Sequence, residues 1–166
     1  MLYHLSEEPD IAHFDPRPAE GLSYPVVWAI TRAKLRNYLF PRDCPRVTYF
    51  AGPKTTREDV ERFLGPSPAV AAFEAAWLDR VRSTTLYCYH LPEATFTCVD
   101  ECAGYFHSRE SVTPERVEVF DNLLSKLVSE GVEVRILPTL WPLRDAVVAS
   151  TLSFSIIRMR NAKPRG

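Results

Sequence analysis

The sequence predicts one α+β domain over residues 1–166, with a curved or split, mostly antiparallel sheet and peripheral helices. Three observations predict this fold class. Segments typical of strands outnumber those typical of helices, and the two do not alternate regularly as in a doubly wound parallel sheet. A length of 166 residues suits a single domain. The 14 prolines are spread along the chain, so they mark short connections and not a linker.

Short apolar and aromatic runs predict the strands. Several of these runs alternate between apolar and polar residues, and a proline or glycine often lies near their ends. The run at 25–30 is continuously apolar, so we expect that strand to be buried on both faces. The segment 12–24 before it contains prolines and is expected to be irregular. The expected strands are "LYHLS" (2–6), "PVVWAI" (25–30), "RVTYFA" (46–51), "TTLYCYHL" (84–91), "ATFTCV" (94–99), "GYFHS" (104–108), "ERVEVF" (115–120), "VEVRIL" (132–137) and "FSIIRM" (154–159).

Capping residues and three-to-four spacing predict the helices. The strongest pattern is "SPAVAAFEAAWLDRVRS" at 67–83, where Ser67 is a natural N-cap, Pro68 suits the first turn and Val70 begins an apolar stripe. The other expected helices run from Thr31 to about Phe40, from Thr55 or Thr56 to Gly65, from Asp121 to Gly131, and over 141–150 with Pro142 in the first turn.

Composition argues against several classes of protein. With 20 basic and 21 acidic residues the net charge is -1, so no global field favours nucleic acid or an anionic membrane. No apolar run is long enough to span a membrane, and the acidic residues from Glu7 onward argue against a signal peptide. We therefore expect a cytoplasmic protein that is not bound to a membrane and does not have nucleic acid as its partner.

The four cysteines admit two interpretations. Cys98 and Cys102 are four residues apart, with His90 and His107 nearby in the sequence, so a zinc site is one interpretation. The cysteines lack the paired C-x-x-C spacing of structural zinc sites. Without an export signal, reduced and mostly buried thiols are the favoured interpretation, and we expect no metal.

The common enzymatic signatures are absent from this sequence: it has no P-loop, no dinucleotide G-x-G-x-x-G, no G-x-S-x-G elbow and no H-E-x-x-H. The residues left to carry chemistry are polar ones within apolar strands. His4 and Ser6 are two apart, so on a strand they point to one face and can hydrogen-bond a ligand together. The alternative, which the spacing alone favours, is a partly buried His4 bonded to a backbone carbonyl.

Three segments concentrate charge. "FPRDCPR" (40–46) holds Arg42 and Arg46 in a proline-stiffened loop, which can present guanidinium groups to a phosphate or carboxylate; equally, the aspartate between them pairs with one of them. "HSRES" (107–111) places Glu110 beside Arg109, where the acid either orients a ligand hydroxyl or pairs loosely with Arg109 in solvent. The basic tail from about 158 is expected to be solvated.

Long segments of the chain resemble a bacterial family of small uncharacterised proteins, known as a domain of unknown function. The resemblance runs over nearly the whole chain and implies no activity. The segments that carry it are "LYHLSEEPDI", "FDPRP", "VVWAI", "FPRDCPRVT", "STTLYCYHLP" and "LWPLRDAVVASTLSFSIIRMRNAKPR".

A more distant resemblance is to ADP-ribosyltransferase-like proteins. It rests on the opening strand "YH" with a following serine, on "LYCYHLPEATF" and on "YFHSRESVTPERVEVF". The resemblance implies NAD or another ADP-ribose compound as substrate, with His4 at the nicotinamide ribose and Trp28 where a residue packs on the nicotinamide. It also implies a glutamate on a late strand. No acid stands at the expected position, and Glu101 and Glu110 are the nearest candidates.

Three hypotheses follow. In the first, the chain is an ADP-ribosyltransferase-like transferase or hydrolase with His4 and Glu110 as catalytic residues. In the second, which the missing acid favours, it is a catalytically silent module of the same fold that binds a nucleotide or a phosphorylated small molecule. In the third, it is an interaction protein without a ligand, whose polar residues satisfy one another. The candidate ligand-binding residues are Ser6, Arg17, Trp28, Arg42 and Arg46.

Overall fold

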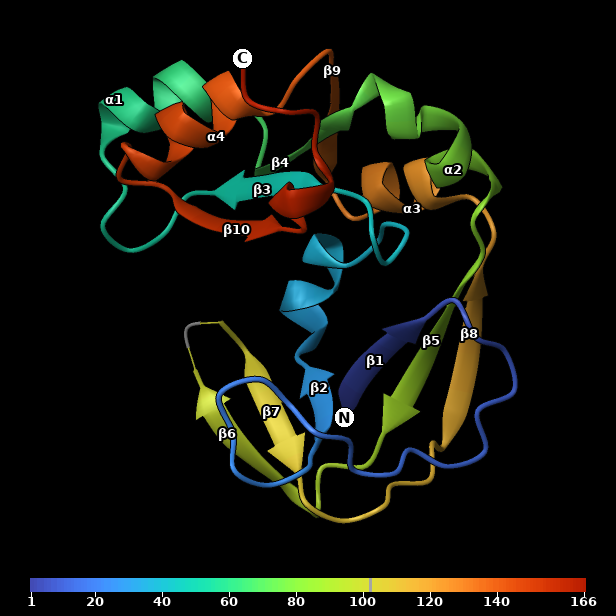
Figure 1. The fold of residues 1–166 in the computed structure, drawn as a ribbon. Helices are drawn as coiled ribbons and strands as arrows, with labels where there is room; N and C mark the ends of the chain where they lie inside the picture. The colour runs from blue at the N-terminus through green and yellow to red at the C-terminus, as the bar shows by residue number, and fades with distance from the viewer. Residues whose placement is uncertain (102) are drawn as a thin grey trace. The chain divides into compact units, whose positions relative to one another are not determined.

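The structure is a computed structural model that describes residues 1–101 and 103–166. The chain divides into two compact units, each built from two segments. We call Met1–Leu39 with Thr85–Asp121 the six-stranded unit, and Phe40–Thr84 with Asn122–Gly166 the four-stranded unit, after the sheet that each contains (Figure 1). The α+β class with a split, mostly antiparallel sheet is confirmed. The single domain stays a prediction.

The sheet of the six-stranded unit is antiparallel, in the order β6-β7-β2-β1-β5-β8. Each strand falls on an apolar run that predicted it. A short 3₁₀ helix, η1 (Arg32–Asn37), follows β2 where a helix from Thr31 was expected. The strands are β1 (Leu2–Ser6), β2 (Val27–Ile30), β5 (Leu86–Leu91), β6 (Phe96–Asp100), β7 (Tyr105–Ser108) and β8 (Arg116–Phe120).

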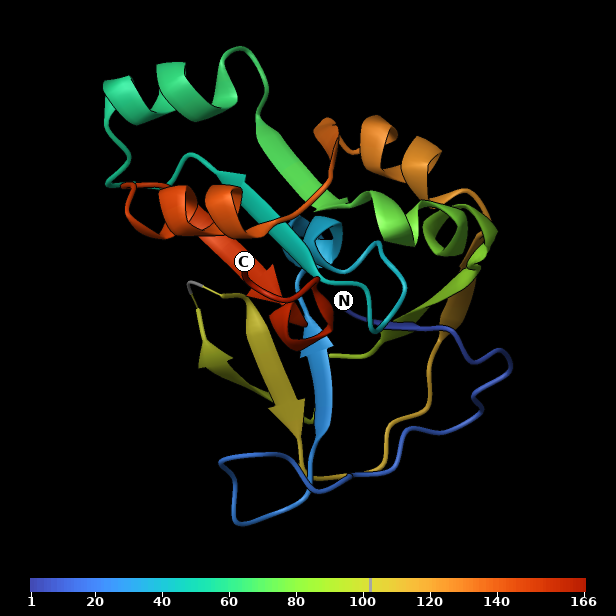
Figure 2. The ribbon, with the colours of Figure 1, turned by 45° about the horizontal axis from the view of Figure 1, so that its top comes forward.

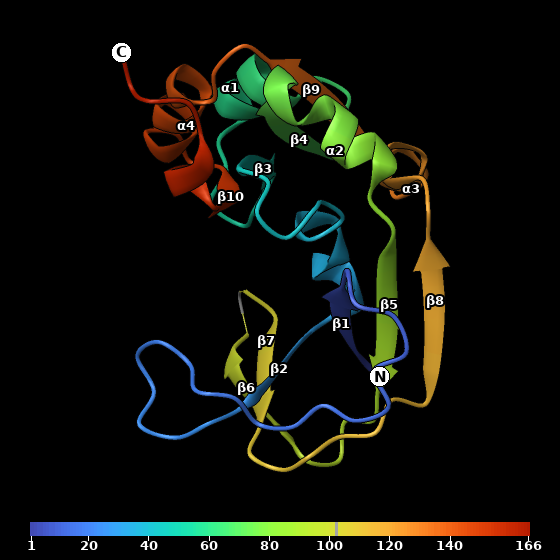
Figure 3. The ribbon, with the colours of Figure 1, turned by 45° about the vertical axis from the view of Figure 1, so that its right-hand side comes forward.

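One face of this sheet, which we call the covered face, packs with the segment between β1 and β2. Leu2 and Tyr89 lie on this face and form an apolar cluster with Phe14 of that segment, which is drawn in blue in Figure 3. The Tyr89 hydroxyl donates to the carbonyl of Glu8 at 2.8 Å. This hydrogen bond connects the irregular segment to the sheet. The segment is therefore held in place although it forms no strand of its own.

The opposite face, which we call the aromatic face, carries Tyr3 and Ile30, and these pack with Leu35 of η1. Side chains alternate along a strand, so Trp28 shares this face with Ile30. Trp28 is 37% exposed. The expectation that the strand at 25–30 is buried on both faces is therefore wrong at Trp28, because its neighbours on this face are the half-buried aromatic residues of β7 and not an aliphatic layer.

The sheet of the four-stranded unit has the order β10-β3-β4-β9, in which β4 and β9 are parallel and the other pairs antiparallel. Its strands are β3 (Arg46–Phe50), β4 (Ala69–Glu74), β9 (Val132–Leu137) and β10 (Ser153–Ile157). Its helical segments are α1 (Arg57–Asp59), η2 (Val60–Leu64), η3 (Ala75–Trp77), α2 (Leu78–Ser83), α3 (Leu123–Ser129), α4 (Trp141–Val148) and η4 (Met159–Asn161).

The helix expected at 67–83 is wrong over its first half. Residues 69–74 form β4, and helical structure begins only at η3. Every β4 residue is at most 1% exposed, because β3 and β9 flank the strand and both of its faces are covered. A strand buried on both faces has no polar alternation, so its apolar run resembles a buried helix. Ser67, the expected N-cap, instead donates its hydroxyl to Glu133 at 2.6 Å.

Helical segments η2 and α4, whose ribbons are drawn in Figure 2, contribute side chains to the core of this unit. Phe63 of η2 and Val147 of α4 pack with Tyr49 of β3 in one apolar cluster. Thr56, one of the two expected starts, caps α1 by accepting the amide of Asp59 at 3.2 Å. The helix expected from Asp121 to Gly131 is α3, and its N-cap is Asn122, one residue after Asp121. No helix of the described residues is both long and apolar enough to cross a membrane.

The basic C-terminal segment is anchored to the four-stranded unit. The amide of Lys163 donates to the buried carboxylate of Glu74 at 3.0 Å, and the indole of Trp141 donates to the Lys163 carbonyl at 2.7 Å. Arg165 pairs with Asp145 and lies over the Trp141 ring, 5.2 Å from its centroid. The side chains of Arg160, Lys163 and Arg165 are exposed, as expected for a solvated tail, while the Lys163 amide is bonded to a buried acid.

Candidate functional site

His4 is held by the neighbouring strand. Its Nδ1 lies 2.9 Å from the carbonyl oxygen of Trp28, which can only accept, so Nδ1 is the donor. The imidazole packs against Phe14 on the covered face, with ring centroids 4.8 Å apart. Direct pairing of β1 with β2 is confined to Tyr3 and Ile30, and the His4 bond connects the strands beyond that pair. This arrangement is the one that the spacing alone favoured, a partly buried histidine on a backbone carbonyl.

Ser6 and Arg17 take part in local backbone structure. Ser6 shares the covered face with His4, as the spacing predicts, and its hydroxyl accepts the amide of Glu8 at 3.0 Å. Arg17 forms an isolated antiparallel bridge with Val26 through its backbone, with N–O distances of 3.0 and 2.9 Å, and its side chain is exposed. Ser6 therefore closes a turn, whereas the Arg17 side chain remains available to solvent.

Trp28 belongs to a group of four aromatic side chains in the six-stranded unit. Its ring lies 5.9 Å from that of His107 and 6.3 Å from that of Tyr105, and the His107 ring lies 5.7 Å from that of Tyr24. All three contacts are edge-to-face, the geometry that aromatic quadrupoles favour. We call Tyr24, Trp28, Tyr105 and His107 the aromatic surface.

The sheet register brings a hydroxyl beside the aromatic surface. Thr97 of β6 pairs with His107 of β7, and His107 pairs with Trp28 of β2. Directly paired residues point to the same face, so a hydroxyl, an imidazole and an indole follow one another across three strands. Thr97 is exposed. Within the described residues, the buried Nδ1 atom of His107 has no hydrogen-bond partner.

Arg109 and Glu110 follow β7 directly. The Arg109 guanidinium lies over the Tyr24 ring, 4.5 Å from its centroid, at the edge of the aromatic surface. The Glu110 backbone is fixed by Ser108, whose hydroxyl accepts the Glu110 amide at 3.1 Å. In the part of the chain that the structure describes, no ion pair joins Arg109 to Glu110, and the exposed Glu110 carboxylate has no partner. The loose pairing that the sequence allowed is therefore not what positions Arg109.

Arg46 lies in the four-stranded unit and is only 3% exposed. Its guanidinium donates to the carbonyl of Cys44 at 2.9 Å and reaches the carbonyl of Pro41 at 3.5 Å. These bonds hold the proline-rich loop from inside. Arg46 thus donates to backbone oxygens of its own loop. These bonds compensate the buried charge, so no ligand is needed to explain it.

Arg42 is exposed on the same loop, and the loop is bound to the C-terminal segment. The carbonyl of Arg42 accepts from Arg158 at 3.3 Å, and the carbonyl of Asp43 accepts from Asn161 at 2.8 Å. The Asp43 carboxylate lies 3.6 Å from the Arg158 guanidinium. The aspartate between the two loop arginines therefore pairs with a distant arginine, an outcome that spacing within the loop could not indicate.

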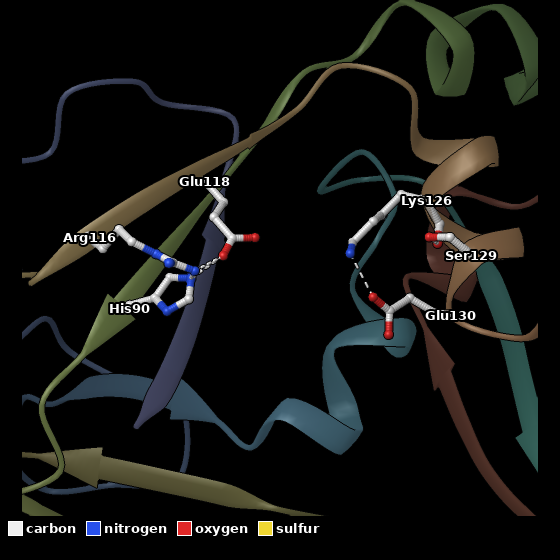
Figure 4. Close-up of polar contacts among 6 residues, drawn as sticks. All are labelled: His90, Arg116, Glu118, Lys126, Ser129 and Glu130. Atoms are coloured by element: carbon white, nitrogen blue, oxygen red, sulfur yellow. Dashed lines mark hydrogen bonds and ion pairs between the residues drawn. The ribbon is translucent and has the colours of Figure 1, made fainter.

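Two further clusters contain charged pairs (Figure 4). In the six-stranded unit, Glu118 of β8 pairs with Arg116 and lies 3.1 Å from Nε2 of His90. On α3, Lys126 lies 2.6 Å from Glu130, one helical turn away. Partly exposed pairs of this kind contribute about 0.2–1 kcal/mol each. They satisfy one another and add no group that awaits a ligand.

The cysteines offer no metal centre within the described residues, where no group of three or more His, Cys, Asp or Glu could hold a metal ion. Cys44, Cys88 and Cys98 are free thiols, and the first two are buried. Cys102, part of the zinc interpretation, lies outside the described residues. His107 contacts aromatic rings and His90 contacts Glu118.

The structure therefore separates five of the seven candidate residues into three places. His4 and Ser6 lie on the covered face, Trp28 lies on the aromatic face of the same sheet, and Arg42 and Arg46 lie in the four-stranded unit. Sequence reasoning missed Tyr105 and His107 as neighbours of Trp28, and also missed the residues around them, which are Tyr24, Thr97 and Arg109. The signal that could have found two of them is the alternation in "GYFHS", which puts Tyr105 and His107 on one face of a strand.

The chain belongs to the DUF6886 family, a family of unknown function, whose model matches residues 3–162. The resemblance to a domain of unknown function is thereby confirmed. No curated protein and no solved structure matches the chain. Because the family has no stated activity, function has to be argued from the arrangement of the side chains.

Proposed function

We propose that the six-stranded unit is a nucleotide-binding module whose aromatic surface stacks on a planar ring of NAD or of another ADP-ribose compound. The observation that carries this proposal is the partly exposed Trp28 ring, 37% accessible, set between His107 and Tyr105. A large indole left exposed on a central strand has lost part of the stabilisation that burial would give it. Stacking of a base on such a ring restores that contact area.

The neighbours of Trp28 suit a nucleotide better than a purely apolar ligand. Stacking of a base on an aromatic side chain contributes about 1–3 kcal/mol. Thr97 of β6, which pairs with His107 of β7, adds an exposed hydroxyl. This hydroxyl can donate a hydrogen bond to a ribose or accept one from it. Aromatic surface with a few polar groups at its margin is the usual composition of a small-molecule site.

A silent module is better supported than an ADP-ribosyltransferase. Cleavage of the bond between nicotinamide and ribose develops positive charge on the sugar, which a carboxylate in a site shielded from water stabilises most strongly. Glu110 is exposed, so solvent screens its charge. His4 lies on the covered face and donates from Nδ1 to the Trp28 carbonyl, away from the face that carries the indole ring.

The direct test is a calorimetric titration of the purified protein with NAD, ADP-ribose and AMP. We expect binding by the parent protein and a loss of at least about tenfold in affinity for Trp28→Ala, because the stacking contribution is removed. Trp77→Phe is the matched control, since Trp77 lies in η3 of the four-stranded unit. Absence of binding by the parent, or equal binding by Trp28→Ala, overturns the proposal and leaves an interaction protein.

The same ligands test the residues that the sequence put forward. His4→Ala and Arg42→Ala are expected to bind NAD as the parent does, since neither residue belongs to the aromatic surface. Release of nicotinamide from NAD separates the module from the transferase. We expect none from the parent; turnover that is lost in Glu110→Gln but kept in Glu101→Gln would instead establish the ADP-ribosyltransferase-like enzyme, with Glu110 as its acid.

We also propose that the protein works in the cytoplasm. The free thiols of Cys44, Cys88 and Cys98 support this, because reduced cysteines are the normal state there. Fractionation of cells that carry a tagged copy tests the location, and recovery from an oxidising compartment would contradict it.

A further inference from the structure

Arg109 and Arg116 of the six-stranded unit differ in what their guanidinium groups contact. It lies 4.5 Å above the Tyr24 ring, and Tyr24 is in turn 5.7 Å from His107. In residues 1–101 and 103–166, the Arg109 guanidinium has no hydrogen bond and no ion pair. Arg116, by contrast, pairs with Glu118. Arg109 is thus an exposed cation placed by an aromatic ring and not by an acid.

Stacking on a ring prepares a guanidinium for an anion. A planar guanidinium over an aromatic face keeps the N–H groups at its edges directed away from the ring, where they can bind a phosphate through two parallel hydrogen bonds. Because the ring already restricts the side chain, less conformational entropy is lost when a ligand binds. The opposite arrangement, an arginine paired with a carboxylate, would have to break that pair first.

We propose that Arg109 binds the phosphate of a nucleotide whose base stacks on the aromatic surface, and that Tyr24 is the positioning residue for its guanidinium. This inference rests on the proposed function and deepens it by naming the ligand class: nucleoside phosphates are bound more tightly than nucleosides. The order Trp28, His107, Tyr24, Arg109 supports it, since consecutive members are in contact and the cation stands at the end of the row.

The experiment compares adenosine with AMP as paired probes, which share the base and differ in the phosphate. We expect the parent to bind AMP at least about tenfold more tightly than adenosine. This is the gain in affinity that one charge-assisted hydrogen bond provides. In Arg109→Gln the affinity for AMP falls to that for adenosine, and the affinity for adenosine is unchanged. Arg116→Gln is the matched control, since it makes the same change of charge in the same unit and keeps the preference for AMP.

Variants of Tyr24 test the positioning role separately. Tyr24→Phe keeps the ring and should keep the preference for AMP, whereas Tyr24→Ala should reduce it while Arg109 is still present. A preference that survives Tyr24→Ala unchanged overturns the role of Tyr24. Thermal unfolding of each variant identifies any that fails to fold. Such a variant is replaced in the comparison with the parent by Arg109→Lys, which keeps the charge but not the planar fork of the guanidinium.

The outcomes separate this inference from the proposed function. Binding of adenosine and AMP with equal affinity by the parent overturns the phosphate site and leaves the stacking module intact. An equal loss of both probes in Arg109→Gln also overturns it, because the arginine would then support the surface and not the phosphate. Failure of the parent to bind either probe overturns the proposed function itself, and the phosphate site with it.

Discussion

The buried charges of the four-stranded unit and the exposed charges beside the aromatic surface of the six-stranded unit differ in the partners that they have. In the four-stranded unit, Glu74 and Arg46 are 1% and 3% exposed, and each is bonded to backbone groups. Glu74 accepts the amides of Leu140 and Lys163, at 3.2 and 3.0 Å. A buried charge is tolerated only with such partners, so these residues serve the fold.

In the six-stranded unit, the charged groups nearest the aromatic surface have no such partners. The Arg109 guanidinium and the Glu110 carboxylate are exposed, and neither forms an ion pair or hydrogen bond within the described parts of the chain. A ligand is therefore expected at the six-stranded unit. The four-stranded unit satisfies its buried charges Glu74 and Arg46 with backbone groups, whereas the six-stranded unit leaves an indole, a hydroxyl and a guanidinium exposed.

The largest expected effect tests whether stability is concentrated in β4. Phe73 is fully buried, and its ring centroid lies 5.8 Å from that of Phe40. Phe73→Ala should lower the free energy of unfolding by about 3–5 kcal/mol, since it leaves a cavity in a close-packed strand. Trp28→Ala, in the partly exposed aromatic surface, should cost at most about 1.5 kcal/mol. Urea unfolding measures both, and a Trp28→Ala cost equal to that of Phe73→Ala would contradict the comparison.

Most of the fold could be predicted, because hydrophobic pattern and turn residues agree locally with the structure. Strands at 2–6 and 132–137 and the start of α1 at Thr56 follow from such signals. The strand β4 could not be predicted from its own residues. Its first five residues, "AVAAF", are all apolar and show no alternation, and what makes the segment a strand is the pairing with β3 and β9, which are distant in sequence.

The candidate site was less predictable than the fold, for a related reason. The spacing of His4 and Ser6 gave their common face correctly but not their partners, which are a backbone carbonyl and a turn amide. The aromatic residues in contact with Trp28 come from β7, and Tyr24, from the loop before β2, contacts one of them. Only the register of β2 with β7, which pairs Trp28 with His107, brings them together.

A second prediction compares cysteines of the two units. Cys44, in the four-stranded unit, is fully buried, and burial above all raises its pKa to about 12, with Glu74 raising it further and Arg46 opposing. Cys98, in the six-stranded unit, is exposed. The thiolate is the reactive form, so iodoacetamide at neutral pH should label Cys98 and leave Cys44 unmodified until the protein unfolds, as peptide mass spectrometry will show.

The raised pKa of Cys44 also sets the sign of a pH effect. The unfolded thiol ionises near its ordinary value of 9.0, whereas the folded thiol keeps its proton to about pH 12. Between these values the native state holds more protons than the unfolded state, so stability falls as the pH rises. Cys44→Ala should remove that part of the decline. An unchanged slope between pH 9 and the onset of alkaline unfolding would contradict the assignment.

The smallest expected effect concerns Asp59, a partly exposed acid that, unlike Glu110, has partners. Hydrogen bonds from the hydroxyl and the amide of Thr151 hold the pKa of Asp59 below its ordinary value of 3.8. Thr151→Val removes the hydroxyl bond and keeps the amide, so the pKa should rise part of the way toward that value. A lowered folded pKa gives stability above the ordinary value that is lost as the pH falls through the folded one, so the variant should lose part of this dependence below about pH 4. A carboxyl NMR titration measures the shift in the pKa of Asp59.

Thr55→Val is the control, since Thr55 bonds Gly52 and the Thr151 carbonyl but not Asp59. An equal shift in both variants would place the cause outside the Thr151 hydroxyl.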